Sequence, residues 1–393
     1  MTELAVMFGA GNVGRGFLGQ LFSESGMEVV FVDVDETLIR VLNARKSYFI
    51  RLVDNEYSEK VQVSPVRAYH SRQSEEVGRA LAQATIAATA VGARALSLIA
   101  PLIAKGVVER QVNGRVQPLN FIICENLHGA AEFFRNMVIQ YIPASCLEYF
   151  KTKIGFVETV IGRMVPPPTP EMRAEDPSQI LVEPYKELPV DRLGFIGSPP
   201  EIVGMQVCDN FPAYTARKLY LHNCGHAVLG YLGYLHGYQY GYEALVDQVI
   251  RPIFEKALDE SVHGIVKQFG VEERWLKDHQ ADLTRRFANR ALGDTNFRLG
   301  RDPLRKLAAN DRLVGAARLA EKAGVLPEGL SWGIAGGFAF NAPEDPMAVE
   351  LQARLTREDF KSVLADVSQI QPGELLAELV FDRYKRLRHG IKG

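Results

Sequence analysis

The sequence lacks the features of a membrane, secreted or metal-binding protein. Its longest almost purely apolar run, residues 95–104, is about half as long as a membrane span and contains Pro101. The first residues, Met1-Thr2-Glu3-Leu4, have neither the basic start nor the apolar stretch of a signal peptide. The four cysteines form no C-x-x-C pair and the eight histidines no H-E-x-x-H, so we expect no metal site. We expect a cytoplasmic protein with free thiols.

An excess of charge is also missing. The chain has 45 basic and 47 acidic side chains, which leaves no long-range field that would attract nucleic acid. Hydrophobic residues make up 47% and charged residues 23%, as in ordinary globular proteins. A length of 393 residues fits two domains. We therefore expect a small-molecule partner, no nucleic-acid or membrane partner, and a monomer or homodimer.

The first half of the chain alternates short apolar runs with helical stretches. The runs lie at residues 4–8, 29–32, 85–91 and 121–124. Apolar runs that alternate with helices are typical of a parallel, doubly wound sheet covered on both faces. Prolines crowd residues 166–200, where they prevent helix propagation and suit an irregular or edge-strand connection. After Asn210 the pattern is helical, which predicts an α/β domain over residues 1–200 and a mainly α-helical domain over residues 201–393.

A glycine-rich turn follows the first apolar run and reads Gly9-Ala10-Gly11-Asn12-Val13-Gly14. This G-x-G-x-x-G pattern allows a tight turn, a close approach of a pyrophosphate and close packing of helix and strand. Asp33 ends the second run, where its carboxylate can bind ribose hydroxyls and repel a 2′-phosphate. The alternative is a glycine turn without a ligand. The context favours a Rossmann-type domain that binds NAD rather than NADP.

The end of the third apolar run, Thr89-Ala90-Val91-Gly92, is a second candidate part of this site. Small residues there allow a cofactor to lie across the carboxyl ends of the strands. We therefore add Thr89 and Val91 to the candidate cofactor residues. A plain strand-to-helix turn explains the same residues equally well.

A lysine, an asparagine and a histidine share one predicted helix in the second half. At about 100° per residue, Lys218, His226 and Asn223 lie at about 0°, 80° and 140° around the axis. Hydride transfer from an alcohol to NAD needs a base for the hydroxyl proton and donors for the oxygen. By pattern alone, a solvated lysine with packed polar neighbours is the favoured interpretation.

Four segments resemble the polyol-specific long-chain dehydrogenases: residues 9–19 (GAGNVGRGFLG), Cys124-Glu125-Asn126, Val165-Pro166-Pro167, and Arg217-Lys218-Leu219 with Asn223-x-x-His226. The resemblance implies a Rossmann domain followed by a helical domain, and metal-independent chemistry. It implies that Lys218 is the general acid/base and that Asn126 and Asn223 hydrogen-bond the reacting oxygen. His226 would orient the substrate or polarise its carbonyl.

Eight cations lie between Arg285 and Arg312, against three aspartates, so the local charge is +5. A solvated face is one explanation, and nucleic-acid binding lacks the interleaved aromatic residues it needs. The third explanation is a clamp for a sugar phosphate, because arginine can donate two parallel hydrogen bonds to a phosphate. Arg305 and Lys306 lie in a segment, residues 301–307, that also matches the family. We select these two as candidate phosphate ligands.

The function that the resemblance implies is the interconversion of D-mannitol 1-phosphate and D-fructose 6-phosphate, with NAD as cofactor and a lysine as acid/base. The chain length favours this phosphate-using branch of the family. The alternatives are a fructuronate reductase, a dehydrogenase of unphosphorylated mannitol or arabinitol, and an NAD-binding sensor without catalysis.

Overall fold

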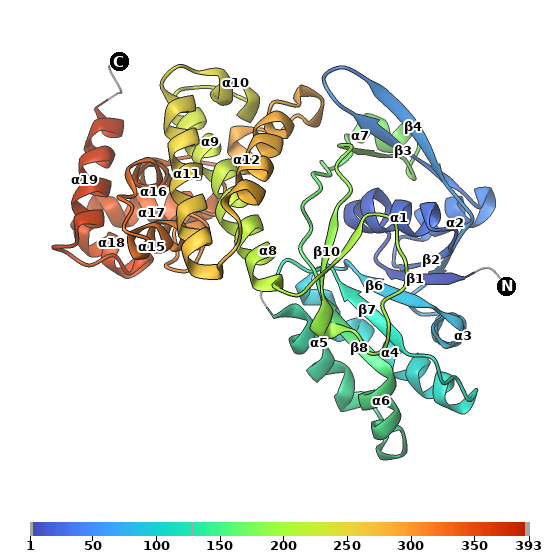
Figure 1. Ribbon diagram of the computed structural model, residues 1–393. Coiled ribbons are helices and arrows are strands. Elements are labelled where there is room, and N and C mark those ends of the chain that lie inside the picture. The colour runs from blue at the N-terminus through green and yellow to red at the C-terminus, as the bar shows by residue number, and fades with distance from the viewer. Residues whose placement is uncertain (1–2, 128, 390–393) are drawn as a thin grey trace. The chain divides into compact units, whose positions relative to one another are not determined.

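Two units make up the chain, one ending at Phe211 and one beginning at Pro212. The structure, a computed structural model, describes residues 3–127 and 129–389 (Figure 1). The sequence prediction placed the domain boundary at residue 200. No helix in the described ranges is long and apolar enough to cross a membrane.

Six parallel strands form the central sheet of the first unit, in the order β5-β2-β1-β6-β7-β8. They are β1 (Leu4–Phe8), β2 (Glu28–Asp33), β5 (Val66–His70), β6 (Ile86–Thr89), β7 (Leu119–Ile123) and β8 (Ile154–Glu158). Counted along the chain this is the order 3-2-1-4-5-6 of dinucleotide-binding folds. The predicted doubly wound parallel sheet is confirmed. Its switch point lies between the carboxyl ends of β1 and β6.

Both faces of the sheet are covered, as the apolar strands predicted. Along β1, Leu4, Val6 and Phe8 belong to one core, while Ala5 and Met7 belong to the other. The first core is completed by α3 (Ser74–Gln83), α4 (Leu96–Val112), α5 (Ala130–Val138) and α6 (Leu147–Lys153). The second is completed by η1 (Gly14–Leu18), α1 (Gly19–Glu24) and α2 (Glu36–Arg45).

A smaller sheet and the proline-rich stretch complete the first unit. The hairpin β3 (Tyr48–Val53) and β4 (Ser58–Val63) pairs with β9 (Ile180–Val182), and Figure 1 shows the hairpin as a long ribbon. Residues 163–183, here called the covering segment, contain α7 (Pro170–Glu175) and β9. Three side chains of the covering segment pack against Gly16: those of Val165, Ile180 and Val182. A Cβ added to Gly16 would lie 2.7–3.0 Å from them. The strands β10 (Leu188–Asp191) and β11 (Met205–Cys208) follow.

The second unit consists of helices and contains no strand within its described residues. These helices are α8 (Phe211–Arg217), η6 (Lys218–Asn223), α9 (Cys224–Leu235), α10 (Gly241–Val246), α11 (Ile250–Phe269), α12 (Glu273–Phe287), η7 (Arg290–Leu292), α13 (Asn296–Gly300), α14 (Pro303–Lys306), α15 (Val314–Lys322), α16 (Glu328–Ala339), α17 (Pro346–Arg357), α18 (Phe360–Ser368) and α19 (Leu375–Arg388). Helix α9 lies largely in the interior, with nine of its twelve residues buried. Glycines let neighbouring helices approach it: a Cβ on Gly230 would lie 2.7 Å from the Leu299 side chain. The predicted mainly helical second part is confirmed.

Candidate active site

The glycine loop connects β1 to the helical turn η1 in a conformation that only glycine allows. Gly9 has φ +93°, and a Cβ there would lie 2.4 Å from the carbonyl oxygen of Ala90. A Cβ on Gly14 would lie 1.9 Å from the carbonyl oxygen of Gly9. Around Gly11, by contrast, no heavy atom of the described residues lies within 4 Å of such a Cβ. Gly9 and Gly14 therefore set the turn, and Gly11 leaves open space for a ligand.

Asp33 holds the loop from the carboxyl end of β2. Its Oδ2 accepts a hydrogen bond from the Ala10 N–H (2.6 Å), and its Oδ1 accepts from the N–H groups of Val34 and Asp35. The half-buried carboxylate thus lies beside the open loop, where ribose hydroxyls can reach it. Asn12 and Val13 are half-buried and begin the helix.

The residues after β6 lie next to the glycine loop. Phe8, the last residue of β1, pairs with Thr89, and its carbonyl oxygen accepts a hydrogen bond from the Ala90 N–H. The Thr89 side-chain oxygen is buried and has no hydrogen-bond partner within the described residues. Glu125 fixes the next turn: its carboxylate accepts from the N–H groups of Val91 and Gly92. An open loop, a carboxylate and an unpartnered buried hydroxyl at one sheet edge fit a dinucleotide.

Asn126 follows β7 in an exposed bend of the first unit. The other three predicted catalytic residues belong to the second unit, on the continuous helical run of α8, η6 and α9. The structure therefore brings Lys218, Asn223 and His226 together on one helix, and the predicted cofactor residues together at one sheet edge.

The helix is not a regular α-helix at the lysine. Residues Lys218–Asn223 form a π-helical turn, in which i→i+5 hydrogen bonds replace i→i+4 bonds. The assumed 100° per residue is therefore wrong for this turn. One more residue per turn brings Asn223 back toward the side of the helix from which Lys218 projects. Single π-turns of this kind occur frequently at functional sites.

His226 lies against Phe287 with the ring centroids 4.0 Å apart and the planes at 26°. His222 meets it edge-on, with the centroids 4.8 Å apart. Burial, followed by the positive charge of Lys218, holds the pKa of both histidines well below the ordinary value. Burial and Arg217 lower the pKa of His279, on α12, to about 2. All three imidazoles are neutral at neutral pH.

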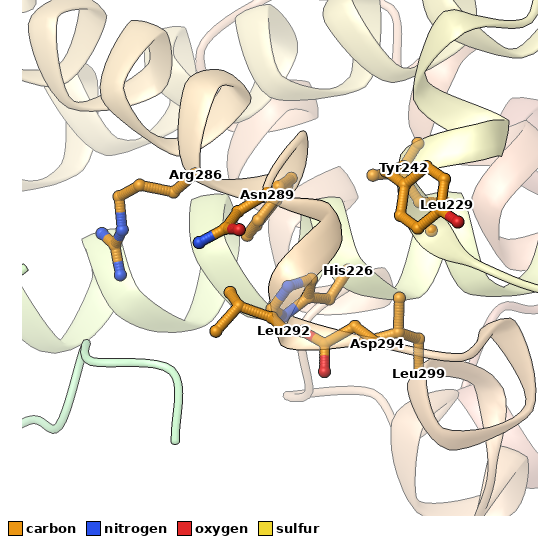
Figure 2. Close-up of a pocket in the computed structure, with 10 residues that line it drawn as sticks. His226, Leu229, Tyr242, Arg286, Asn289, Leu292, Asp294 and Leu299 are labelled. Atoms are coloured by element: carbon orange, nitrogen blue, oxygen red, sulfur yellow. The ribbon is translucent and has the colours of Figure 1, made fainter. Parts of the chain in front are cut away.

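His226 also lines a small pocket of the second unit that encloses about 280 Å³, part of it open to solvent. Figure 2 shows it between His226, Tyr242, Arg286, Asn289, Leu292 and Asp294. Arg286 is almost completely buried, and its Nη1 lies 3.4 Å from the Asp282 carboxylate. Asp294 forms an ion pair with Arg298. The pocket wall therefore offers a cation, an amide and an imidazole within one small space.

The two predicted phosphate ligands do not line this pocket. Arg305 is exposed and forms ion pairs with Asp302 and Asp311. Lys306 is buried, and its Nζ donates to the carbonyl oxygen of Leu299, a pocket residue. Burial and the neighbouring Arg312 lower the pKa of Lys306 to about 7.

Two residues of these sites were missed as functional candidates: Glu125 and Arg286. Glu125 stood within the Cys124-Glu125-Asn126 match, and Arg286 stood within the basic stretch. No group of three or more potential metal-ligating side chains occurs in the described part of the chain.

Two family models match almost the whole chain. The mannitol dehydrogenase Rossmann domain matches residues 3–204, and the mannitol dehydrogenase C-terminal domain matches residues 210–388. The chain belongs to the mannitol dehydrogenase family. This confirms the resemblance to polyol dehydrogenases. Curated relatives include mannitol-1-phosphate 5-dehydrogenases from Bacillus velezensis and Bacillus subtilis, 37% and 36% identical over 97% of this chain and 99% of each relative.

Two solved structures share the fold of this chain. The chain is similar to Pseudomonas fluorescens mannitol 2-dehydrogenase, solved with NAD and D-mannitol, with a TM-score of 0.73 and 16% identity. It is also similar to a substrate-free D-sorbitol dehydrogenase, with a TM-score of 0.81 and 17% identity. These alignments cover 99% of this chain and 92% and 93% of the two structures.

The neutral histidines predict that the second unit loses stability as the pH falls below about 6.5. Below this pH a histidine of the unfolded chain binds a proton, whereas a folded histidine with a lowered pKa does not. Each such histidine therefore lowers the free energy of unfolding by about 1.4 kcal/mol for each pH unit below about 6.5. His222→Gln should reduce this slope by about that amount. Urea unfolding between pH 7.5 and 5, followed by the fluorescence of Trp275 and Trp332, measures it.

The control is His263→Gln, which removes an exposed histidine from α11 and should leave the slope unchanged. An unaltered slope in His222→Gln would show that His222 titrates normally in the folded protein.

Proposed function

We propose that the protein catalyses the NAD-dependent interconversion of D-mannitol 1-phosphate and D-fructose 6-phosphate. The similarity to mannitol-1-phosphate 5-dehydrogenases over 97% of the chain carries this proposal. Two features of the structure support it: the sheet edge with Gly9–Gly14, Asp33, Thr89 and Val91, and the helix with Lys218, Asn223 and His226.

The cofactor is assigned to the glycine loop. NAD supplies the hydride acceptor when it is bound. The free side of Gly11 admits the pyrophosphate, and the Asp33 carboxylate accepts hydrogen bonds from the adenosine ribose. These assignments follow from the open loop and from the position of Asp33 at the end of β2.

We assign the proton transfer of the reaction to Lys218. In polyol oxidation its neutral amine accepts the hydroxyl proton at Nζ, and in ketose reduction its ammonium returns that proton to the oxygen. The amides of Asn126 and Asn223 donate hydrogen bonds to the same oxygen. A neutral His226 serves as a hydrogen-bonding group that orients the sugar, because its lowered pKa keeps it uncharged.

The proposal extends to the setting of the enzyme. We assign it to the cytoplasm as a monomer or homodimer that acts on a free sugar phosphate, without nucleic-acid or membrane partners. All four cysteines are buried free thiols, which fits a reducing compartment.

A substrate panel tests the function. NADH oxidation is measured with fructose 6-phosphate, fructose and fructuronate, and NAD reduction with mannitol 1-phosphate, mannitol and arabinitol. The phosphorylated pair should give the highest kcat/KM. A higher value for fructuronate or for an unphosphorylated sugar identifies a sister activity, and NADH binding without turnover identifies a sensor.

Replacement of Lys218 tests the mechanism. Lys218→Ala should lower kcat by about 10²–10⁴-fold, the usual contribution of acid–base catalysis. In the wild type, oxidation should rise with pH through one ionisation, because the neutral amine is the base, and reduction should fall through a comparable one. Steady-state kinetics between pH 6 and 10 measure both. Lys218→Arg is the control: it keeps the charge but has no accessible neutral form, so it should be equally slow.

Replacement of Asp33 tests the cofactor site. Asp33→Ala should raise the Kd for NADH about 10- to 150-fold, the range for the loss of a hydrogen bond to a charged group. The replacement should also reduce the preference for NADH over NADPH. Fluorescence titration with both cofactors measures this. A wild type that already prefers NADPH would contradict the role of Asp33.

Replacement of Arg305 tests the phosphate site. Arg305→Ala should raise KM for fructose 6-phosphate far more than for fructose and leave kcat nearly unchanged. The reason is that a phosphate contact stabilises the bound substrate and the transition state equally. Arg274→Ala, which removes an exposed arginine of α12, is the control. Equal effects on both sugars would place Arg305 on a solvated face.

A further inference from the structure

Arg15 is a buried arginine directly behind the glycine loop, with 6% of its surface exposed. It lies in the π-helical turn η1, between Gly14 and Gly16. Its Nε donates to the carbonyl oxygen of Ala10 at 2.5 Å. Its Nη1 donates to the carbonyl oxygens of Pro177 (3.1 Å) and Ser178 (2.5 Å) in the covering segment. One guanidinium thus joins the loop to the segment that covers its helix.

The bond to Ala10 fixes the orientation of the peptide group between Ala10 and Gly11. In a planar trans peptide the N–H points away from the preceding C=O. Because the Ala10 carbonyl points to Arg15, the Gly11 N–H points the opposite way. A Cβ added to Gly11 would meet no heavy atom of the described residues within 4 Å, so the loop is open at this residue. The Ala10 N–H is held by Asp33, so both peptide groups of Ala10 are fixed.

Burial of this charge is costly. Desolvation lowers the pKa of Arg15, and the negative charges of Asp33, Asp35 and Asp176 oppose this effect. A buried charge is tolerated when hydrogen bonds satisfy its donors, and three carbonyl oxygens do so here. A second tether holds the same residue, because the Tyr48 hydroxyl donates to the Arg15 carbonyl at 2.7 Å.

We propose that Arg15 is a positioning residue for the pyrophosphate of the cofactor: it holds the Ala10–Gly11 peptide so that the Gly11 N–H is directed toward the phosphates. The inference rests on the proposed NAD site. Arg15 acts through the loop, and its side chain makes no contact with the cofactor in this role.

A purely structural role is the alternative, and Arg163 provides the matched comparison. Arg163 is also buried and also joins the covering segment to the same helix. Its Nε donates to the carbonyl oxygen of Glu183, and its Nη1 donates to Gly16 and to the Gln20 side chain. None of these bonds reaches the peptide groups of Ala10.

The experiment compares Arg15→Met with Arg163→Met in the full-length protein. Both should lower the melting temperature, because both remove a buried tether. Only Arg15→Met should raise the Kd for NADH, by about tenfold or more, since it removes a charge-assisted bond on which the loop peptide depends. In kinetics, Arg15→Met should raise KM for NAD and leave KM for the sugar phosphate and kcat at saturating NAD near the wild-type values.

An unchanged Kd for NADH in Arg15→Met overturns the proposal, as does an equal rise in both variants. Where Arg15→Met does not fold, Arg15→Lys replaces it. A single ammonium cannot span the carbonyls of Ala10 and Ser178 as a guanidinium does, so the Kd should still rise by about threefold. A wild-type value in Arg15→Lys overturns the proposal. Failure of the wild type to bind NADH would instead overturn the proposed function.

Discussion

The backbone contact between Gly9 and Gly14 is the constraint on which the first unit's site depends. The helix after β1 starts so close to the strand end that a single Cβ at Gly14 would overlap the Gly9 carbonyl oxygen. This closeness places the loop N–H groups at the switch point of the sheet, where adjacent connections leave in opposite directions. The loop is then held by two charged side chains, Asp33 from β2 and Arg15 from η1, while Glu125 holds the neighbouring turn after β6. In the proposed cofactor site, recognition depends on backbone groups, and the side chains fix where those groups point.

In the proposed mechanism, the second unit directs several polar side chains from one helix toward one place. A regular α-helix turns 100° per residue and separates Lys218 from Asn223. The π-turn at Lys218–Asn223 reduces that separation at the cost of less favourable backbone hydrogen bonds. The turn is retained because the helix continues into α9, whose residues are buried against α11, α13 and α16. Tertiary packing of α9 therefore supports an irregular turn beside it.

Continuous apolar runs revealed β1, β2, β6 and β7, because strands covered on both faces need no polar positions. The edge strand β5 has only Val66 and Ala68 fully buried, with Arg67 and His70 between and after them, so its pattern resembles a loop. Most of the apolar run at residues 95–104 belongs to the longer helix α4, which continues to Val112; near its end Arg110 is buried and donates to the carbonyl oxygens of Leu81, Ala82 and Ala84. Lys306 illustrates the same limit: its place in the basic stretch predicts a cation available to a phosphate, but tertiary packing buries its side chain and its Nζ donates to the Leu299 carbonyl oxygen. A charged residue in a sequence therefore reveals neither whether its side chain is buried nor which group it binds.

The distribution of cations explains why one lysine, and not a histidine, holds the proton in the proposed reaction. Four cationic groups, Lys218, Arg298, Arg286 and Lys306, act on His226, and each disfavours an additional positive charge on the imidazole. Burial acts in the same direction, because a charged imidazole in a poorly hydrated site loses its solvation. His226 and His222 therefore remain hydrogen-bonding groups across the physiological pH range. A proton taken from a polyol needs a group that can be charged in one direction of the reaction and neutral in the other. Among the three side chains that the helix brings together, only Lys218 meets that requirement, since Asn223 does not titrate and His226 is kept neutral.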